Sequence, residues 1–155
     1  MRVDEIMSKP AITCHSQDPL SFAAHKMWEH DCGAITVIND EGKLVGMITD
    51  RDICMAGLLQ NQPLGDIPVH IAMARSVYAV EPRQGIEDVE RLMAVHQVRR
   101  IPVVGADGKP IGIVSVNDLT REAAKPQSGL RPGLTRLVQT LALISQPRTE
   151  TQKAA

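Results

Sequence analysis

The hydrophobic positions of the chain follow two kinds of spacing, and each kind predicts its own type of element. Between residues 20 and 28, apolar side chains stand at i, i+3, i+4, i+7 and i+8, which predicts an amphipathic helix. Asp18 and Pro19 stand just before this stretch, and they predict a helix N-cap followed by proline in the first helical position.

Two continuous apolar runs come after this helix. They are AITVI, residues 34–38, and KLVGMI, residues 43–48, and they flank the turn-forming sequence NDEG. Branched side chains on both sides of such a turn predict a β-hairpin. The next segment, DRDICMAGLL, predicts another helix with Thr49 as its N-cap.

The same series of elements occurs a second time. A shift of 66 residues aligns residues 3–53 with residues 69–119 without a gap, which indicates an internal duplication. The second copy predicts a strand at YAV (78–80), a helix over 86–96, strands at RIPVV and PIGIV, and a helix that begins near Ser115.

The duplication predicts an α+β protein of two β-α-β-β-α repeats. We expect the two repeats to pack together with pseudo-twofold symmetry, because one copy of this size would have a marginal core. The predicted boundaries are 2–60 for repeat 1, 61–67 for a connector, 68–124 for repeat 2, and 125–155 for a linker, an amphipathic helix and a mobile C-terminus.

Composition excludes several classes of function. The net charge is −1 and the only aromatic residues are Phe22, Trp28 and Tyr78, so neither bulk charge nor base stacking favours nucleic-acid binding. The N-terminus lacks the features of a signal peptide, and no apolar run approaches a membrane span. We therefore expect a cytoplasmic protein that does not bind membranes.

The residues that often bind metals show no ligand spacing. The cysteines Cys14, Cys32 and Cys54 form no CxxC pair and are interpreted as small buried apolar residues. His30 and His96 coincide in the duplication, but each is expected at a helix C-terminus, where histidine interacts favourably with the dipole. We predict no metal site, no catalytic residues and no catalytic cofactor.

A short motif closes each repeat: GMITDRDI, residues 46–53, and GIVSVNDL, residues 112–119. In each, a hydroxyl residue is expected between a strand and a helix, where free N–H groups can bind phosphate. The aspartate three residues later can accept hydrogen bonds from ribose hydroxyls. The same spacing is also that of a helix capping box, which needs no ligand, and both interpretations stay open.

The order of elements, the duplication and the closing G-x-x-[ST]-x-x-D resemble a pair of CBS domains, the regulatory module named for cystathionine β-synthase. The phrases VDEIMSKP and VRRIPVV are also typical of that family, and the resemblance covers residues 2–124. It implies an adenine nucleotide (AMP, ADP or ATP) in the cleft between the repeats, a homodimer and a regulated partner. The alternatives are an interaction module without nucleotide and another adenosyl ligand, NAD or S-adenosylmethionine.

The resemblance also implies two binding sites by position. The first would have Thr49 at phosphate and Asp52 at ribose, and its lining would be Ile12, Cys32, Ala34 and Met47. The second would have Ser115 and Asp118 in the matching roles, and its lining would be Tyr78, Val98, Arg100 and Ile113.

We predict that the two sites differ in affinity or that one is empty. Arg99 and Arg100 stand where the first copy has Gly33 and Ala34, and Arg51 is matched by Asn117. An arginine in the second copy could contact the phosphate of a nucleotide held mainly by the first copy, or could lie at a solvated strand end.

Beyond the repeats, residues 134–145 carry a helical apolar stripe. Its members are Leu134, Leu137, Val138, Leu141 and Ile144. This helix could pack on its own repeats, on a second copy or on the regulated protein partner.

Overall fold

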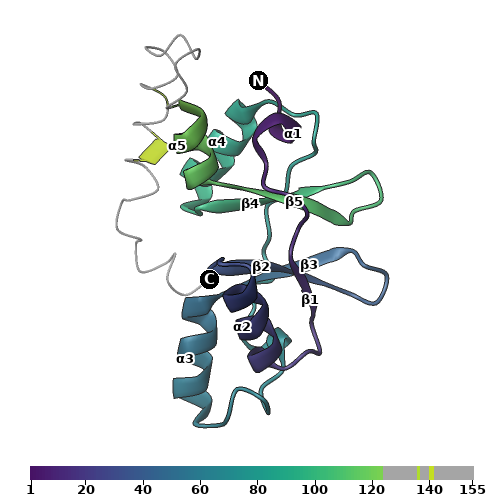
Figure 1. Cartoon of the computed structure of the whole chain (residues 1–155), viewed down its shortest axis with the longest axis vertical. Coiled ribbons are helices and arrows are strands. Elements are labelled where there is room, and N and C mark those ends of the chain that lie inside the picture. The colour runs from purple at the N-terminus through teal and green to yellow at the C-terminus, as the bar shows by residue number, and fades with distance from the viewer. Residues whose placement is uncertain (124–135, 137–139, 142–155) are drawn as a thin grey trace. The chain divides into compact units, whose positions relative to one another are not determined.

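The computed structural model describes residues 1–123, 136, 140 and 141, which belong to two compact units (Figure 1). We call them the first-repeat unit, residues 9–77 and 104–112, and the second-repeat unit, residues 1–8, 78–103 and the described residues from 113 onward. Each unit has its own cluster of buried apolar side chains.

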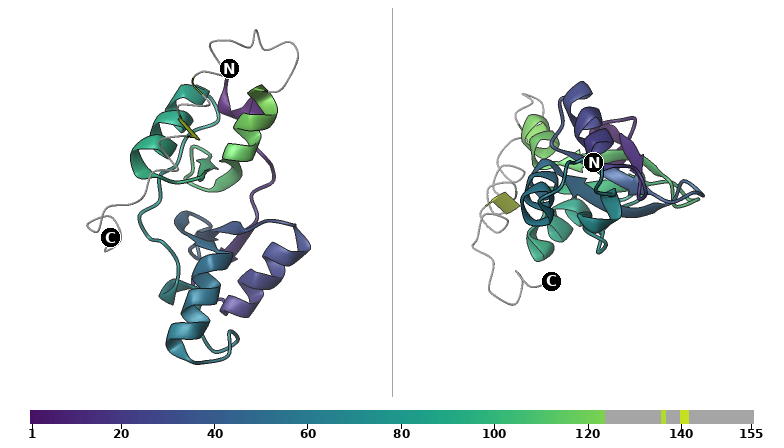
Figure 2. Two further views of the ribbon diagram at one scale, coloured as in Figure 1. Left: turned by 90° about the vertical axis from the view of Figure 1, so that its left-hand side faces the viewer. Right: turned by 90° about the horizontal axis from the view of Figure 1, so that it is seen from below.

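The first-repeat unit is built on a three-stranded sheet of order β1-β2-β3, in which β1 is parallel and β3 antiparallel to β2. Helices α2 and α3 lie side by side and pack on β2 and β3 (Figures 1 and 2). The elements are β1 (Thr13–His15), α2 (Leu20–Glu29), β2 (Ala34–Ile38), β3 (Leu44–Thr49), α3 (Asp50–Gln60) and the 3₁₀ helix η1 (Val69–Ile71). The predicted helices and hairpin are confirmed.

The second-repeat unit repeats this plan with a two-stranded sheet, β4 paired with β5. Its N-terminal helix α1 packs against α5, and Ser8 forms an antiparallel bridge with Ile113. The elements are α1 (Val3–Ile6), α4 (Ile86–His96), β4 (Arg100–Val104), β5 (Pro110–Ser115) and α5 (Val116–Ala123). Residue 104 of β4 and residues 110–112 of β5 are counted in the first-repeat unit.

Two local predictions were wrong. The strand expected at residues 78–80 is reduced to one isolated parallel bridge between Val80 and Val103. Asp18 does not cap α2, because its carboxylate accepts a hydrogen bond of 2.7 Å from the backbone N–H of His15 and closes a turn there. Pro19 occupies the N-cap position, and α2 begins at Leu20.

Most of the predicted tail helix, residues 134–145, lies outside the described residues. The exceptions are Arg136, Thr140 and Leu141. Thr140 is buried, Leu141 packs against the core of the second-repeat unit, and the Arg136 guanidinium lies 3.3 Å from Glu87 and 3.5 Å from Glu90. Among the described residues, no helix has the length and apolar character needed to cross a membrane.

Candidate functional site

The first motif forms a reciprocal cap at the junction of β3 and α3. The Asp52 N–H donates to Thr49 Oγ1 at 3.2 Å, and Asp52 Oδ2 accepts from Thr49 N–H at 2.9 Å and from Thr49 Oγ1 at 2.6 Å. This is the capping box that the spacing allowed, with aspartate in the position where glutamate is more common. Thr49 and Asp52 are both half-buried, so the cap faces partly into solvent.

The second motif forms the same cap with further partners. Asp118 Oδ2 accepts from Ser115 N–H at 2.7 Å and from Ser115 Oγ at 2.5 Å. Its other oxygen, Oδ1, accepts from Ser8 Oγ at 3.0 Å and forms an ion pair with Arg121. The Asp118 side chain is only 3% exposed.

The two aspartates therefore differ in what they can still bind. A carboxylate oxygen has two lone pairs, and both oxygens of Asp118 already have two donors each. In the described part of the chain, Asp52 Oδ1 has no hydrogen-bond donor, while Oδ2 has two. A ribose hydroxyl can therefore donate to Asp52 without displacing a protein group, which it cannot do at Asp118.

The residues expected to line the first site lie in the first-repeat unit, at one end of its sheet. Ala34 begins β2 and pairs with Thr49 at the end of β3. Ile12 comes just before β1, and its carbonyl accepts from Thr36 Oγ1 at 3.0 Å. Met47 lies two residues before Thr49 on β3, and Cys32 comes two residues before β2. Their assignment to a ligand site stays a prediction.

The residues expected to line the second site lie together in the second-repeat unit. Arg100 begins β4, Val98 packs against the core, and Ile113 exchanges two backbone hydrogen bonds of 2.9 Å with Ser8. The Tyr78 ring stacks on the His96 imidazole, with centroids 3.4 Å apart and planes 9° apart. One face of Tyr78 is thus covered.

The contact between His96 and Tyr78 had no signal in the sequence. The coincidence of His30 and His96 in the duplication drew attention to the helix end, and His96 is indeed the last residue of α4. Its partner, Tyr78, lies before that helix at the position equivalent to Ile12 of the first copy, and the spacing of apolar residues does not show that the two rings meet. Only the folded chain brings the two rings together.

The arginines near the motifs differ in their surroundings. Arg51 and Arg99 are exposed and Arg100 is half-buried, and none of the three has an ion-pair partner among the described residues. Arg51 immediately follows the first residue of α3, so its guanidinium is free to meet an anion near the N-terminus of that helix.

The cysteines are not equivalent. Cys14 is buried in β1, and burial, with a smaller effect from Asp18, raises the pKa of its thiol to about 12. Cys32 is half-buried and Cys54 is exposed on α3, so the expectation that all three are buried was wrong for Cys54. Among the described residues, no group of three or more histidine, cysteine or acidic side chains could hold a metal ion.

Comparison with protein families gives one match, the CBS domain, at residues 3–58 and again at residues 64–125. The chain is 36% identical over 117 residues to the CBS domain-containing protein YhcV of Bacillus subtilis, covering 76% of this chain and 81% of YhcV. It is 35% identical over 111 residues to hypoxic response protein 1 of Mycobacterium tuberculosis, covering 71% and 77% of the two chains.

Solved structures show the same similarity. The CBS domain pair of protein MJ0100, in complex with 5′-methylthioadenosine and S-adenosyl-L-methionine, is 31% identical with a TM-score of 0.71, covering 79% of this chain and 94% of that one. Hypoxic Response Protein I with two coordinated zinc ions is 31% identical with a TM-score of 0.71, covering 78% and 98%.

Proposed function

Because the chain belongs to the CBS domain family as a tandem pair, a ligand-binding regulatory module, we propose that it senses an adenine nucleotide and transmits its binding to a partner protein. The observation that carries this proposal is the free oxygen of Asp52, next to Thr49 at the start of α3. A carboxylate with one oxygen fixed and the other open is a preformed acceptor for a ribose hydroxyl.

The surroundings of Asp52 also suit a phosphate group. An eleven-residue helix, α3, begins next to Thr49, and the positive end of its dipole attracts anions. Its first three N–H groups already donate to Gly33 O, Asp50 Oδ1 and Thr49 Oγ1, so a phosphate there would be attracted by charge and not by free N–H groups. Arg51 adds a free guanidinium at the same place. AMP, ADP and ATP combine the ribose and the phosphate that these groups would recognise.

The first repeat is proposed as the main binding site. Asp118 has no lone pair to spare, and Asn117 replaces the cationic Arg51 at the corresponding position. A ligand at the second motif would have to displace Ser8 or Arg121 from Asp118. The hydrogen bond lost within the protein would offset part of the one gained with the ligand.

S-adenosylmethionine is the second candidate, because the CBS pair of MJ0100 is described in complex with it and with 5′-methylthioadenosine. It shares the ribose that Asp52 would bind but lacks the phosphate that Arg51 would favour. Binding of S-adenosylmethionine should therefore depend on Asp52 and be insensitive to removal of the Arg51 charge.

We expect no catalytic activity. The chain covers 81% of YhcV and 77% of hypoxic response protein 1. It matches L-aspartate semialdehyde sulfurtransferase of Methanocaldococcus jannaschii at 32% identity, but covers only 22% of that enzyme. The greater part of the enzyme thus has no counterpart in this match.

Transmission to a partner is proposed to involve a homodimer. Met55, Leu58 and Leu59 lie at i, i+3 and i+4 of α3 and are 41%, 70% and 75% exposed, so they form an apolar stripe on one face of the helix. A second copy is the proposed occupant, in line with the family resemblance. Contact of a regulated partner with residues 134–145 stays a prediction, because the structure describes only residues 136, 140 and 141 of that segment.

The direct test is thermal unfolding with AMP, ADP, ATP, NAD and S-adenosylmethionine added one at a time. A nucleotide at about one hundred times its Kd should stabilise the fold by roughly 2.7 kcal/mol. If none of the five shifts the transition at millimolar concentration, the sensor function is wrong, and the interaction module without nucleotide takes its place.

A further inference from the structure

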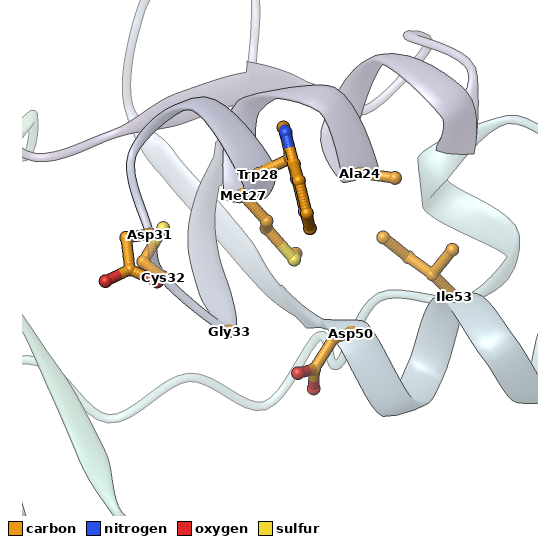
Figure 3. A pocket seen from close by; sticks show the side chains of 8 residues that line it. All are labelled: Ala24, Met27, Trp28, Asp31, Cys32, Gly33, Asp50 and Ile53. Atoms are coloured by element: carbon orange, nitrogen blue, oxygen red, sulfur yellow. The ribbon is translucent and has the colours of Figure 1, made fainter.

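The first-repeat unit contains a pocket of about 390 Å³ between α2 and the start of α3, shown in Figure 3. Its apolar wall is made by Ala24, Met27 and Ile53, and the indole of Trp28 lies over the same space. Asp31 lies on the loop after α2, beside Cys32, and Asp50 lies separately at the start of α3. The volume is in the range of small-molecule sites.

The pocket is separate from the capping motif. Asp50 and Ile53 are one helical turn apart and line the pocket from the same face of α3. Asp52 lies two residues after Asp50, and its carboxylate turns back onto Thr49 at the end of β3. A ligand in this pocket would therefore contact neither oxygen of Asp52.

The charge of the pocket is entirely negative. Its lining contains two carboxylates and no lysine, arginine or histidine. Asp50 Oδ1 accepts a hydrogen bond of 2.7 Å from the Arg51 backbone N–H. Within the described part of the chain, neither Asp31 nor Asp50 has an ion-pair partner.

In the part of the chain that the structure describes, the Trp28 indole takes part in no aromatic stack and no cation–π contact. It is 87% exposed, although it is the largest apolar side chain in the sequence and the only tryptophan. The nearby Lys26 lies over the ring of Phe22, 5.6 Å from its centroid, and so does not use the indole. The face of an exposed indole is the best side-chain surface for a cation.

The second repeat shows that the fold does not require these side chains. Ala94, Gln97 and Val116 stand 66 residues after Trp28, Asp31 and Asp50. The left-handed turn after the helix is nevertheless kept, since Asp31 has a φ of 48° and Gln97 has a φ of 53°. The aromatic ring and both carboxylates are therefore additions of the first repeat, made at positions where the duplicated fold accepts neutral residues.

We propose that this pocket binds a small organic cation, an alkylammonium group with an apolar body. The apolar wall would take the alkyl part, the Trp28 ring would contact the charge by cation–π interaction, and Asp31 and Asp50 would balance it. This site does not depend on adenine nucleotide binding at Asp52.

Choline and 3,3-dimethylbutan-1-ol are suitable probes, because they have nearly the same shape and differ in charge. Trp28 is the only tryptophan, so its fluorescence reports on this pocket in the full-length chain. We expect choline to change the fluorescence in a saturable way, with an affinity that weakens as salt is added. The neutral alcohol should bind at least about fivefold more weakly.

The variants Asp31→Asn and Asp50→Asn test the charges. Asparagine is tolerated in the left-handed conformation that residue 31 adopts, so the Asp31→Asn fold should be preserved, which melting can verify. Each variant should weaken choline binding by about threefold to tenfold and leave binding of the alcohol unchanged. Asp40→Asn, at an exposed hairpin turn, is the matched control and should bind choline like the parent.

Three results would overturn the proposal. These are equal affinities for choline and the alcohol in the parent, unchanged choline affinity in both Asp31→Asn and Asp50→Asn, and no fluorescence response at the highest soluble choline concentration. The absence of a fluorescence response is also expected if a second copy of the chain covers Trp28.

Discussion

At the scale of single residues, Asp52 and Asp118 hold the same position in the duplication but have different environments. Asp118 is almost fully buried and accepts hydrogen bonds from Ser8 and Ser115 in addition to its ion pair with Arg121. Asp52 is half-buried and keeps one oxygen open. One aspartate is therefore suited to stabilising the fold and the other to binding a ligand.

The variants Asp52→Asn and Asp118→Asn should separate these two roles. Asp118→Asn leaves donors without their charged acceptor in a buried place, so we expect it to lower the free energy of unfolding by about 1–3 kcal/mol. Asp52→Asn should lower the free energy of unfolding by less than about 1 kcal/mol. It should lower the affinity for the nucleotide that binds in the melting screen by about tenfold. Urea unfolding and calorimetric titration measure the two effects. Equal nucleotide affinity in Asp52→Asn and the parent would show that Asp52 is only a cap.

The buried Glu90 should make stability depend on pH. Burial raises its pKa above the ordinary value of 4.5, Arg136 opposes the shift, and Glu87 reinforces it. Since the unfolded state ionises first, the free energy of unfolding should fall as the pH rises from 4.5 through the raised pKa. Glu90→Gln should remove this slope in urea unfolding measured across that window, whereas the exposed Glu41→Gln should keep it.

Arg136→Ala provides a second test of the same carboxyl group. Loss of the guanidinium 3.5 Å from Glu90 removes the attraction that favours the ionised form. We expect the pKa of Glu90 to rise further, so the variant should lose more stability near neutral pH than below pH 4.5. An equal loss at both pH values would mean that Arg136 contributes through packing alone.

At the scale of elements, the junctions between strand and helix carry both a stability role and the proposed ligand role. Thr49 caps α3 with its side-chain oxygen, and Thr49→Ala should cost about 1 kcal/mol of unfolding free energy. Thr49→Ser keeps the hydroxyl and should restore both stability and nucleotide affinity. If Thr49→Ser fails to restore nucleotide affinity, contacts other than the hydroxyl must bind the ligand.

The long elements were predictable because their apolar spacing is determined by their own packing. Helix α4 and strand β4 were predicted with the bounds that they have, residues 86–96 and 100–104. The strand at 78–80 was not, since Tyr78 stacks on His96 and only Val80 pairs with β4. Asp18 does not cap α2 because its carboxylate accepts a hydrogen bond from the His15 N–H in the preceding turn.

The candidate site was predictable only in part. The motif and its capping geometry follow from a local spacing of three residues. The burial of Asp118 depends on Ser8, which is 110 residues away in the sequence, and no local pattern reports such a contact. The inequality of the two motifs was expected from Arg51 and Asn117, but the structure adds two contacts at Asp118 Oδ1, the local ion pair with Arg121 and the long-range hydrogen bond from Ser8.

At the scale of the whole molecule, the exposed stripe on α3 makes oligomerisation testable. Leu58→Glu combined with Leu59→Glu would place two charges on the proposed dimer surface, and we expect the variant to be monomeric in light scattering. Val95→Glu, at a 63% exposed position on α4, is the matched control and should not change the mass. A monomeric parent, or a dimeric double variant, would contradict the use of this stripe.

The place of residues 1–8 in the second-repeat unit has a consequence for the order of folding. Val3 is fully buried in the core of that unit, and Ser8 pairs with Ile113 and bonds to Asp118. During synthesis these residues leave the ribosome long before residues 113–118, at rates of about 5–20 residues per second. Val3 therefore lacks its core partners until residues from Val80 onward have been made, and Ser8 waits longer, for Ile113 and Asp118.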